Sequence, residues 1–353
     1  MTVQQAPFAL PPRARILVTG ANGFLASHAT NELLRLGYRV RGTVRGAKPW
    51  LDAFYTAKYG QGNFETVIVE DLGNYLEVSS VLDNVDGIIH LASDVSLTDD
   101  VKKAVPLARK TALTILEVAS RRASIRRVVI GSSSMAAYSP TPNKKGIVVH
   151  ENTWNTSAME MAWNSFSVPE KCADAAESHH RRMTVYSACK MEAEKASWEW
   201  FKRTQPSFDL NSVVSSYAVG KILHKEIPGS TMGWVRSLLR GNKTPMYLIP
   251  PKWFVDVEDI ARLLTVSLLD STVSSERVFA FSESMNWSGV TDILRKLQPE
   301  NHSIPSPLNN EGRDLARILP RDRAIRLLQG FYGQSDMTPI ATSITKGILE
   351  DPS

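Results

Sequence analysis

A tyrosine and a lysine four residues apart are the side chains of this sequence best suited to chemistry. Tyr186 and Lys190 introduce a segment of strong helix formers, residues 191–201, and residues four apart share one face of an α-helix. A free phenol has a pKa of about 10, so protonating a substrate near neutral pH requires a shift of about three units. An ammonium about 4 Å from the phenolate stabilises it enough to lower the pKa by about this amount, at an effective dielectric of about 20. The pair therefore predicts a tyrosine that acts as an acid.

The same spacing occurs a second time, at Tyr217 and Lys221. This second pair follows a β-like run, residues 211–216, and extended residues rise about 3.3 Å each, which separates the two side chains by about 13 Å. We therefore favour Tyr186. The alternative for Tyr186 is an ordinary, partly buried tyrosine, and the spacing alone does not exclude it.

The N-terminal elements point to a bound nucleotide. Arg15–Thr19 is predicted to be a short buried strand, and a turn leads directly from it into an amphipathic helix that ends near Gly37. Gly20 permits the tight turn, Gly23 lets backbone N–H groups approach a pyrophosphate, and Ala26 allows close packing of helix on strand. A strand before the turn and a helix after it favour a dinucleotide site over a purely structural turn.

Basic residues at the end of the next strand indicate which nucleotide binds. An NAD site carries an acidic residue about 20 residues beyond the turn, whereas no Asp or Glu lies between Glu32 and Asp52 here. Arg45, with help from Arg41 or Lys48, would instead pair with a 2′-phosphate. The sequence therefore predicts NADPH, and the alternative is a solvated basic strand end.

Composition fits an enzyme of this kind. The chain has 353 residues, 43% of them hydrophobic, and a net charge of +5 that is spread along its length. No apolar run approaches the roughly 20 residues of a membrane span, and residues 1–12 lack an apolar signal core. Cys172 and Cys189 have no metal-ligand spacing. We expect a cytoplasmic enzyme with no metal, no membrane contact and no nucleic-acid partner.

Strands and helices alternate along the first two thirds of the chain. Further strands are expected at 64–69, 87–90 and 128–130, with helices near 74–83 and 101–122. This pattern predicts an α/β fold with a Rossmann-type, doubly wound parallel sheet. We expect a tail at 1–12, an NADP-binding domain at 13–220 with an irregular insertion at 139–185, and a smaller mixed substrate lobe at 221–353, some of whose segments return to the first domain.

These motifs together resemble the extended short-chain dehydrogenase/reductase family. The resemblance rests on Thr19–Phe24, on the serines that follow the fifth strand, and on Tyr186 with Lys190. Within that family the chain is most similar to the branch of dihydroflavonol reductases, cinnamoyl-CoA reductases and fungal carbonyl reductases. The stretches that carry this closer resemblance are 40–45, 151–155, 186–200 and 254–261.

The resemblance implies roles for individual residues. Tyr186 would donate the proton, Lys190 would lower its pKa and bind the nicotinamide ribose, and a serine would hydrogen-bond the substrate carbonyl. Ser134 fits the motif of the branch best, and Ser133 is the alternative. The residues expected to contact the cofactor are Gly20, Asn22, Gly23, Phe24, Leu25, Arg41, Arg45, Asp71, Leu72, Leu91, Ala92, Ser93, Ser132, Tyr186, Lys190, Ser215 and Ala218.

The chain departs from the family near the nicotinamide. The family usually has Asn-Pro at the positions of Val214 and Ser215, and a proline after Gly220 where this chain has Lys221. The seating of the cofactor there is therefore open.

The predicted function is NADPH-dependent reduction of an aldehyde or ketone by a monomer or homodimer. Two alternatives remain: a nucleotide-sugar epimerase or dehydratase of the same family, and a non-catalytic NADP-sensing regulator. The stretch before Tyr186 carries adaptable apolar side chains, which predict a lid over a bulky apolar substrate; the alternative is a surface insertion. These side chains are Met159, Met161, Trp163, Phe166 and Met183.

Overall fold

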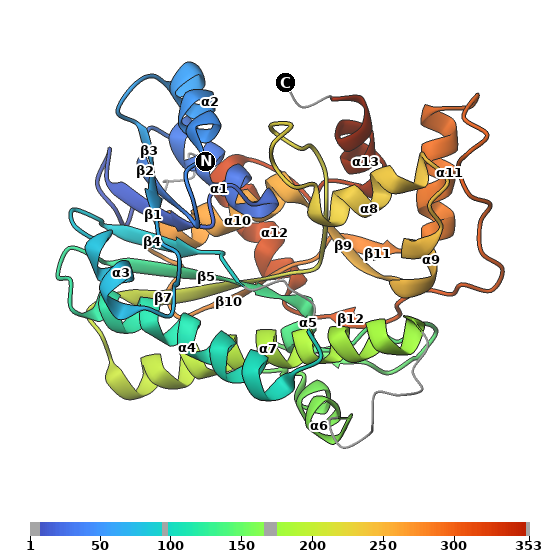
Figure 1. Cartoon of the computed structure of the whole chain (residues 1–353), viewed down its shortest axis with the longest axis horizontal. Helices are drawn as coiled ribbons and strands as arrows, with labels where there is room; N and C mark the ends of the chain where they lie inside the picture. The colour runs from blue at the N-terminus through green and yellow to red at the C-terminus, as the bar shows by residue number, and fades with distance from the viewer. Residues whose placement is uncertain (1–7, 94–97, 166–174, 351–353) are drawn as a thin grey trace.

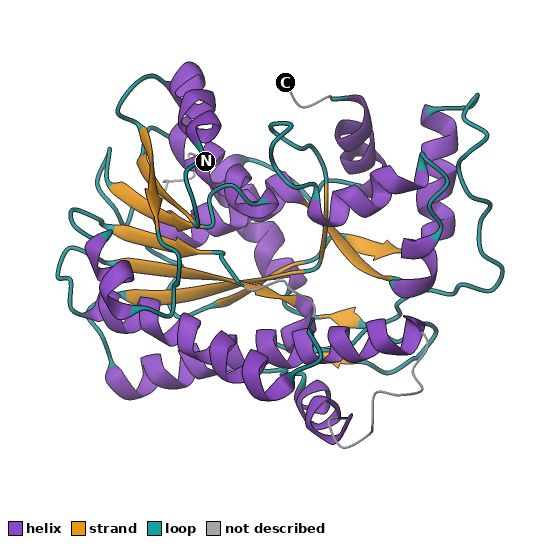
Figure 2. Cartoon of the chain, in the orientation of Figure 1, coloured by secondary structure: helices purple, strands orange, loops and turns teal. Residues whose placement is uncertain are grey.

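A seven-stranded parallel sheet organises the larger part of the molecule (Figures 1 and 2). The structure, a computed structural model, describes residues 8–93, 98–165 and 175–350. The strands lie in the order β10-β7-β5-β4-β1-β2-β3. In chain order they are β1 (Arg15–Thr19), β2 (Arg39–Val44), β3 (Phe64–Ile68), β4 (Gly87–His90), β5 (Arg127–Ser133), β7 (Asp209–Ser215) and β10 (Arg277–Ala280).

Helices cover both faces of this sheet, as the continuous apolar strands require. One face packs against α3 (Tyr75–Ser80), α4 (Val101–Ser120) and α7 (Ala175–Thr204). The other packs against α1 (Phe24–Arg35), α2 (Pro49–Tyr59), α10 (Val257–Leu269) and α12 (Arg321–Tyr332). The doubly wound α/β fold predicted from the sequence is thus confirmed.

The order of the strands reverses between β1 and β4. From β1 the chain winds outward through β2 to β3, and it returns to β4 on the opposite side of β1. The loops after these strands therefore diverge and leave a crevice at the carboxyl edge, where doubly wound sheets bind their ligands. The turn after β1, the end of β5 and the middle of α7 all lie at this edge (Figure 1).

A smaller lobe faces the same edge. The chain leaves the main sheet after Ser215, rather than at 220, and enters a second sheet of order β11-β9-β8, made of β8 (Tyr217–Val219), β9 (Lys252–Asp256) and β11 (Glu283–Met285). The helices of the lobe are α8 (Ser230–Leu238), α9 (Thr244–Leu248), α11 (Trp287–Leu297) and α13 (Ile340–Leu349). Between them, α10, β10 and α12 return to the main sheet.

The insertion at 139–185 is more regular than the sequence indicated. It contains β6 (Val148–Val149), which pairs with β12 (Arg317–Ile318), then α6 (Thr156–Ser165) and the first turns of α7. Tyr186 consequently lies inside a long helix instead of near its start. The first turns of α7 are polar and lack the apolar periodicity by which a helix is predicted from sequence. There α7 is supported by tertiary contacts with the lobe.

The helix α6 lies on the side of α7 away from the main sheet (Figure 1). Its Met159 and Ala162 pack against Val101, Val105 and the outer face of α7, while other apolar side chains of α6 stay exposed. The described contacts of α6 are thus with α4 and α7. Phe166, a further part of the predicted lid, lies outside the described residues, so the lid stays a prediction.

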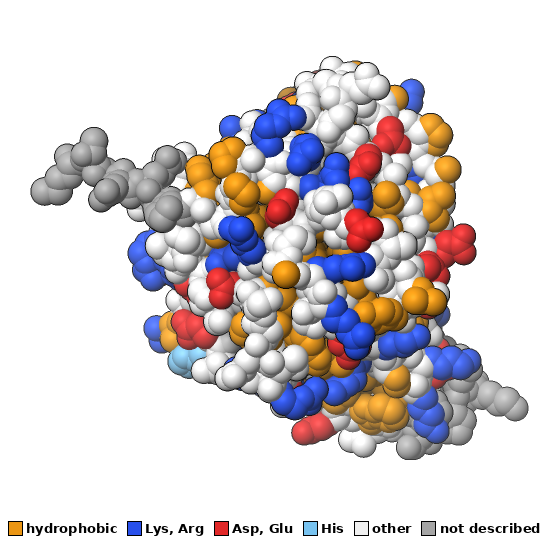
Figure 3. Space-filling model, turned by 90° about the vertical axis from the view of Figure 1, so that its left-hand side faces the viewer, with side chains coloured by type: hydrophobic (Ala, Val, Ile, Leu, Met, Phe, Trp, Pro, Cys, Tyr) orange, Lys and Arg blue, Asp and Glu red, His pale blue; other side chains and the backbone are white. Residues whose placement is uncertain are grey.

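Charged side chains of both signs are mixed on the surface at the amino ends of the strands (Figure 3). In the described part of the chain, no helix is long and apolar enough to cross a membrane. The same residues contain no group of three or more His, Cys, Asp or Glu that could hold a metal ion.

Candidate active site

Tyr186 and Lys190 face the end of β5 from α7. The Tyr186 hydroxyl hydrogen-bonds the hydroxyl of Ser133, and the Lys190 ammonium donates to the carbonyl oxygen of Gly131 at 3.3 Å. Ser133 also caps the short helix α5 (Ser134–Ala137), accepting from the Met135 N–H at 3.3 Å. The predicted tyrosine and lysine are therefore brought together with the serine run.

The two expected serines differ in their surroundings. Ser133 is the one that contacts Tyr186, whereas Ser134 is the first residue of α5 and is 7% exposed. None of the side-chain hydrogen bonds in the described chain involves the hydroxyl of Ser134, and its carbonyl oxygen accepts from the N–H of Tyr138 at 3.0 Å. The resemblance and the geometry thus favour different serines.

The electrostatics differ from the sequence-based expectation. Burial raises the pKa of Tyr186, and the hydrogen bond from Ser133 opposes this only in part. Burial also lowers the pKa of Lys190, which the carboxylate of Glu194 opposes. Burial outweighs the expected lowering of the tyrosine pKa, and the ammonium of Lys190 binds a backbone carbonyl. In this arrangement Tyr186 keeps its proton at neutral pH, as a proton donor must.

A buried carboxylate beneath Lys190 is a feature that sequence reasoning missed. Glu194, one helical turn beyond Lys190, is 1% exposed and pairs with Arg277 of β10 at 2.9 Å. It also accepts from the hydroxyls of Ser132 at 2.7 Å and Ser212 at 2.6 Å. The spacing of four from Lys190 was a visible signal, but the partners come from distant strands.

Ser132 therefore requires a correction. We expected it to contact the cofactor, but its hydroxyl is committed to Glu194 and its carbonyl oxygen accepts from Ser215 at 3.2 Å. Side chains alternate along a strand, so Ser132 points to the face opposite to that of Ser133. Ser215 is another expected contact of the cofactor, and its hydroxyl is the donor of this bond to the Ser132 carbonyl oxygen.

The glycine-rich turn after β1 has the geometry of an anion site. Gly20 has a φ of +68°, and a Cβ there would lie 3.2 Å from the Cβ of Ala92. The following helix α1 begins at Phe24 without a side-chain cap and without an acidic residue in its first turn. Its first N–H groups are thus available to a phosphate. Asn22 and Gly23 belong to this same turn, and Leu25 lies in the first turn of α1.

The ends of β1 and β4 are joined by one hydroxyl. The Thr19 hydroxyl accepts from the N–H groups of Leu91 and Ala92, each at 3.0 Å, so its own proton goes to Nδ1 of His90 at 3.0 Å. Burial, with a contribution from the charge of Lys190, lowers the pKa of His90 to about 4. The ring is consequently neutral, and the expected contacts Leu91, Ala92 and Ser93 are held beside the turn.

Arg41 of β2 and Arg45, which follows the strand, have different surroundings. Arg45 follows the strand directly, is exposed, and takes part in none of the hydrogen bonds or ion pairs between described residues. Arg41 donates to Glu65 at 2.8 Å and to the carbonyl oxygens of Val81 at 2.8 Å and Asp83 at 3.0 Å. These partners lie away from the carboxyl edge, so the expectation that Arg41 holds the cofactor is corrected.

Three other expected contacts lie at the edge of the crevice. Asp71 and Leu72 follow β3, and the Asp71 carboxylate accepts from the N–H of Gly73 at 2.7 Å. Ala218 is buried in β8, on the lobe side. In the second tyrosine–lysine pair, Tyr217 lies in the strand β8, and Lys221 pairs with Glu350 at 2.6 Å.

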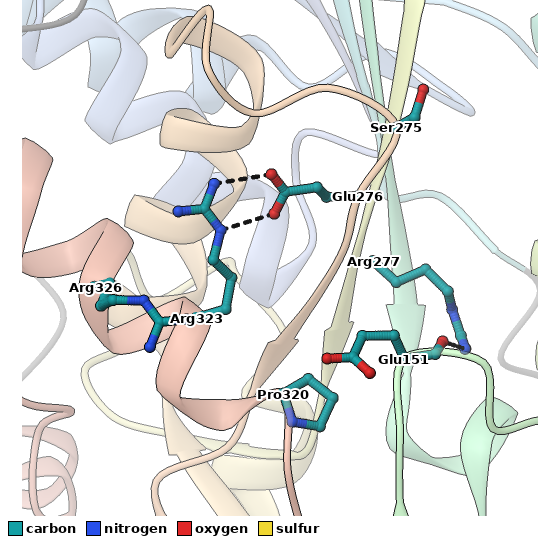
Figure 4. Close-up of a pocket in the computed structure, with 7 residues that line it drawn as sticks. All are labelled: Glu151, Ser275, Glu276, Arg277, Pro320, Arg323 and Arg326. Carbon is teal, nitrogen blue, oxygen red and sulfur yellow. Dashed lines mark hydrogen bonds and ion pairs between the residues drawn. The ribbon is translucent and has the colours of Figure 1, made fainter.

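A pocket of about 300 Å³ lies elsewhere, where β10 begins and α12 starts (Figure 4). Two of its arginines, Arg323 and Arg277, are already paired. Arg323 binds Glu276 through two hydrogen bonds of 2.8 and 2.9 Å, and Arg277 binds Glu194 and the carbonyl oxygen of Glu151. This pocket lies at the amino edge of the sheet and contains none of the residues around Tyr186.

Comparison with known proteins agrees with this geometry. Residues 16–279 match the family model described as the NAD dependent epimerase/dehydratase family. The chain belongs to this family. It is 38% identical to Ketoreductase adrE of Penicillium roqueforti over 351 residues, which cover 99% of both chains. It is 36% identical to Aldehyde reductase 2 of Sporidiobolus salmonicolor over 313 residues, 88% of each.

Solved structures share the fold. The structure of Gre2 from Candida albicans in complex with NADPH has a TM-score of 0.76 at 23% identity, over 96% of this chain and 98% of that one. Vestitone reductase from alfalfa has a TM-score of 0.69 at 21% identity, over 95% and 97%. The predicted family, the extended short-chain dehydrogenases/reductases, is confirmed.

Proposed function

We propose that this protein is an NADPH-dependent reductase of an aldehyde or ketone. The observation that carries the proposal is the meeting of Tyr186, Lys190 and the serines of β5 at the edge where the glycine turn and α1 would hold a dinucleotide. Full-length similarity to proteins named ketoreductase and aldehyde reductase supports this reaction over the epimerase and regulator alternatives.

The residues of the chain fit the cofactor. The uncapped N-terminus of α1 would receive the pyrophosphate, and Arg45, which has no acidic neighbour on its strand end, would pair with a 2′-phosphate. Gre2, which shares the fold, is complexed with NADPH, and the more distant UDP-glucuronic acid 4-epimerase from Bacillus cereus is complexed with NAD. Bound NADPH supplies the hydride that reduces the carbonyl carbon.

The remaining chemistry belongs to the side chains. Ser133 or Ser134 donates a hydrogen bond to the carbonyl oxygen and so orients it, while Tyr186 delivers the proton to that oxygen. Lys190 stabilises the tyrosinate that results, because a cation beside a phenolate favours the charged form. Burial keeps Tyr186 protonated until the carbonyl oxygen develops charge. General acid catalysis of this kind contributes about 10² to 10⁴ in rate.

The test is NADPH consumption with a panel of aromatic, aliphatic and polyketide-like aldehydes and ketones. Tyr186→Phe should lower kcat by at least about 10² on any substrate that the wild type reduces, because the proton donor is lost. The Kd of NADPH should stay within a few-fold. Near-normal turnover by this variant would exclude Tyr186 as the acid.

A matched control is Tyr59→Phe. Burial raises the pKa of Tyr59 as well, to about 12, but this tyrosine lies on α2 and donates to Asn31. Its loss should leave kcat within twofold. Exchangeable NADPH binding without turnover on the whole panel would instead favour the regulator.

A further inference from the structure

Two helical turns before Tyr186, α7 carries another polar side chain on the same face. His179 precedes Tyr186 by seven residues, which is about two turns and about 10 Å along the axis. Its Nε2 atom is buried and has no hydrogen-bond partner in the described chain. Nearly all buried polar atoms of proteins are paired, so an unpaired one directed into a cleft is a candidate contact for a ligand.

Lys252, the first residue of β9, is the second unpaired group. The residue is only 8% exposed, and none of the hydrogen bonds or ion pairs found between described residues involves its ammonium. The Nζ atom lies 5.9 Å from the centre of the Tyr217 ring. Burial lowers the pKa of Lys252 to about 8, which leaves it mostly charged at neutral pH. A buried charge without a partner is costly, so such a lysine is rarely retained for stability alone.

The charge of Lys252 acts on His179 where α7 reaches the small lobe. Burial lowers the pKa of His179, and the charges of Arg182 and Lys252 lower it further, so the imidazole is neutral and can donate one N–H. The helix α7 contacts α9 of the lobe, and Figure 1 shows it continuing from beneath the main sheet to beneath the lobe. His179 thus lies on the Tyr186 face of α7, and the charge of Lys252 acts on it from the lobe.

The carboxylate whose charge acts on Lys252 does not pair with it. Asp314 raises the pKa of Lys252 through space, but the two are not among the ion pairs between described residues. Its oxygens accept instead from the hydroxyl of Tyr138 at 2.7 Å and from the N–H of Ala316 at 3.0 Å. The ammonium donors of Lys252 thus remain available.

We propose that Lys252 and His179 form a second subsite of the cleft, which binds a carboxylate of the substrate about 10 Å from the carbonyl reduced beside Tyr186. This inference rests on the proposed reductase function and specifies its substrate class. The substrate is an aldehyde or ketone with an apolar body and an acidic far end. Lys252 supplies the charge, His179 supplies a directed N–H, and the Tyr217 ring borders the site.

The probe is a pair of compounds that differ only in this charge, 9-oxodecanoic acid and its methyl ester. Both are ketones of a length that spans about two helical turns, about 10 Å. Binding to the NADPH complex is measured by calorimetry, and turnover by NADPH oxidation. The wild type should bind the acid at least tenfold more tightly than the ester, with a lower KM and a similar kcat.

Lys252→Met should remove the preference. It should raise the KM of the acid at least tenfold while leaving the KM of the ester and both kcat values within twofold. Replacing a desolvated ammonium by an apolar chain of similar length does not threaten the fold. The control is Lys202→Met, which removes an exposed lysine at the other end of α7 and should change neither compound.

The outcomes separate the two proposals. Equal binding of acid and ester by the wild type, or an unchanged preference in Lys252→Met, would overturn the subsite whatever the turnover. Tight binding of the acid that depends on Lys252, without any NADPH oxidation on this or the wider panel, would support the subsite and overturn the reductase function instead.

Discussion

Neighbouring serines at the end of β5 have different surroundings because the chain turns there from strand into helix. Ser132 points to Glu194, Ser133 contacts Tyr186, and Ser134 begins α5. Three residues of one type in a row therefore have three different roles. The same holds on β2, where Arg41 is bound to Glu65 while Arg45 is exposed at the strand end.

Single substitutions at the serines should identify the one that binds the carbonyl. Ser133→Ala should lower kcat/KM by at least about 10², because it removes a hydroxyl that contacts Tyr186 and is available to a substrate oxygen. Ser134→Ala should lower it by less than tenfold. Steady-state kinetics on the best substrate of the panel measures both, and a larger loss for Ser134→Ala would return the role to the serine favoured by the family resemblance.

Cofactor choice should depend on Arg45 and not on Arg41. Arg45→Ala should lower kcat/KM with NADPH by roughly tenfold or more and barely affect NADH, since a charge-assisted hydrogen bond is worth about 1.5 to 3 kcal/mol. Arg41→Ala is the matched control, and the ratio of NADPH to NADH should not change. Equal kcat/KM of the wild type with both cofactors would contradict the assignment.

At the scale of elements, α7 connects catalysis to the strands beneath it. Glu194 pairs with Arg277, and the Arg277 guanidinium carbon stacks 3.8 Å from the centre of the Trp154 ring. This arrangement joins α7, β10 and the loop before α6. Because Glu194 lies one turn below Lys190, it also raises the pKa of that lysine against the effect of burial.

Glu194→Gln should therefore shift the pH profile as well as stability. A buried arginine left without its carboxylate costs about 3 to 5 kcal/mol, which urea denaturation measures. Without the carboxylate the pKa of Lys190 falls further, so the ammonium loses its proton at a lower pH. As the pH is raised, the decline in kcat should therefore begin earlier than in the wild type. Glu192→Gln, which removes a more exposed partner of Arg109 on the same helix, should cost less than about 1 kcal/mol and leave the profile unchanged. An unshifted profile in a folded Glu194→Gln enzyme would exclude the electrostatic role.

At the scale of the whole molecule, one arginine joins the sheet to the returning segment. Arg127, at the start of β5, is 2% exposed and pairs with Asp209 at 2.8 Å. Its guanidinium also donates to backbone carbonyl oxygens at the end of α10 and beyond it, those of Ser267, Leu268, Asp270 and Val273. The segment that returns from the small lobe through α10 and β10 is held to the main sheet at this point.

Arg127→Met should destabilise the protein by at least about 3 kcal/mol, because several buried carbonyl oxygens lose their donor. The free energy of unfolding in urea measures this. The kcat of the folded variant should stay within twofold, since Arg127 lies at the amino edge, opposite Tyr186. Arg126→Met, at the exposed neighbouring arginine, should change stability by less than about 0.5 kcal/mol. Similar stability of the two variants would contradict the joining role.

Local patterns were enough to predict the elements and the main catalytic pair. The strand at 15–19, the glycine turn and the helix after it follow from short-range preferences, and the spacing of Tyr186 and Lys190 places them on one face wherever the helix lies. The alternation of elements implies a parallel sheet, and with it a carboxyl edge where the loops meet. These features depend on residues close together in the chain.

Only the tertiary structure showed which side chains are paired or buried by segments that lie far apart in the sequence. Arg41 is unavailable because Glu65 and the carbonyl oxygens of residues 81 and 83 come to it from other elements. Glu194 finds its partners on three distant strands, and the charge of Lys252 acts on His179 because α7 extends beneath the lobe. Burial and pairing arise when the layers assemble, so spacing along the chain cannot reveal them.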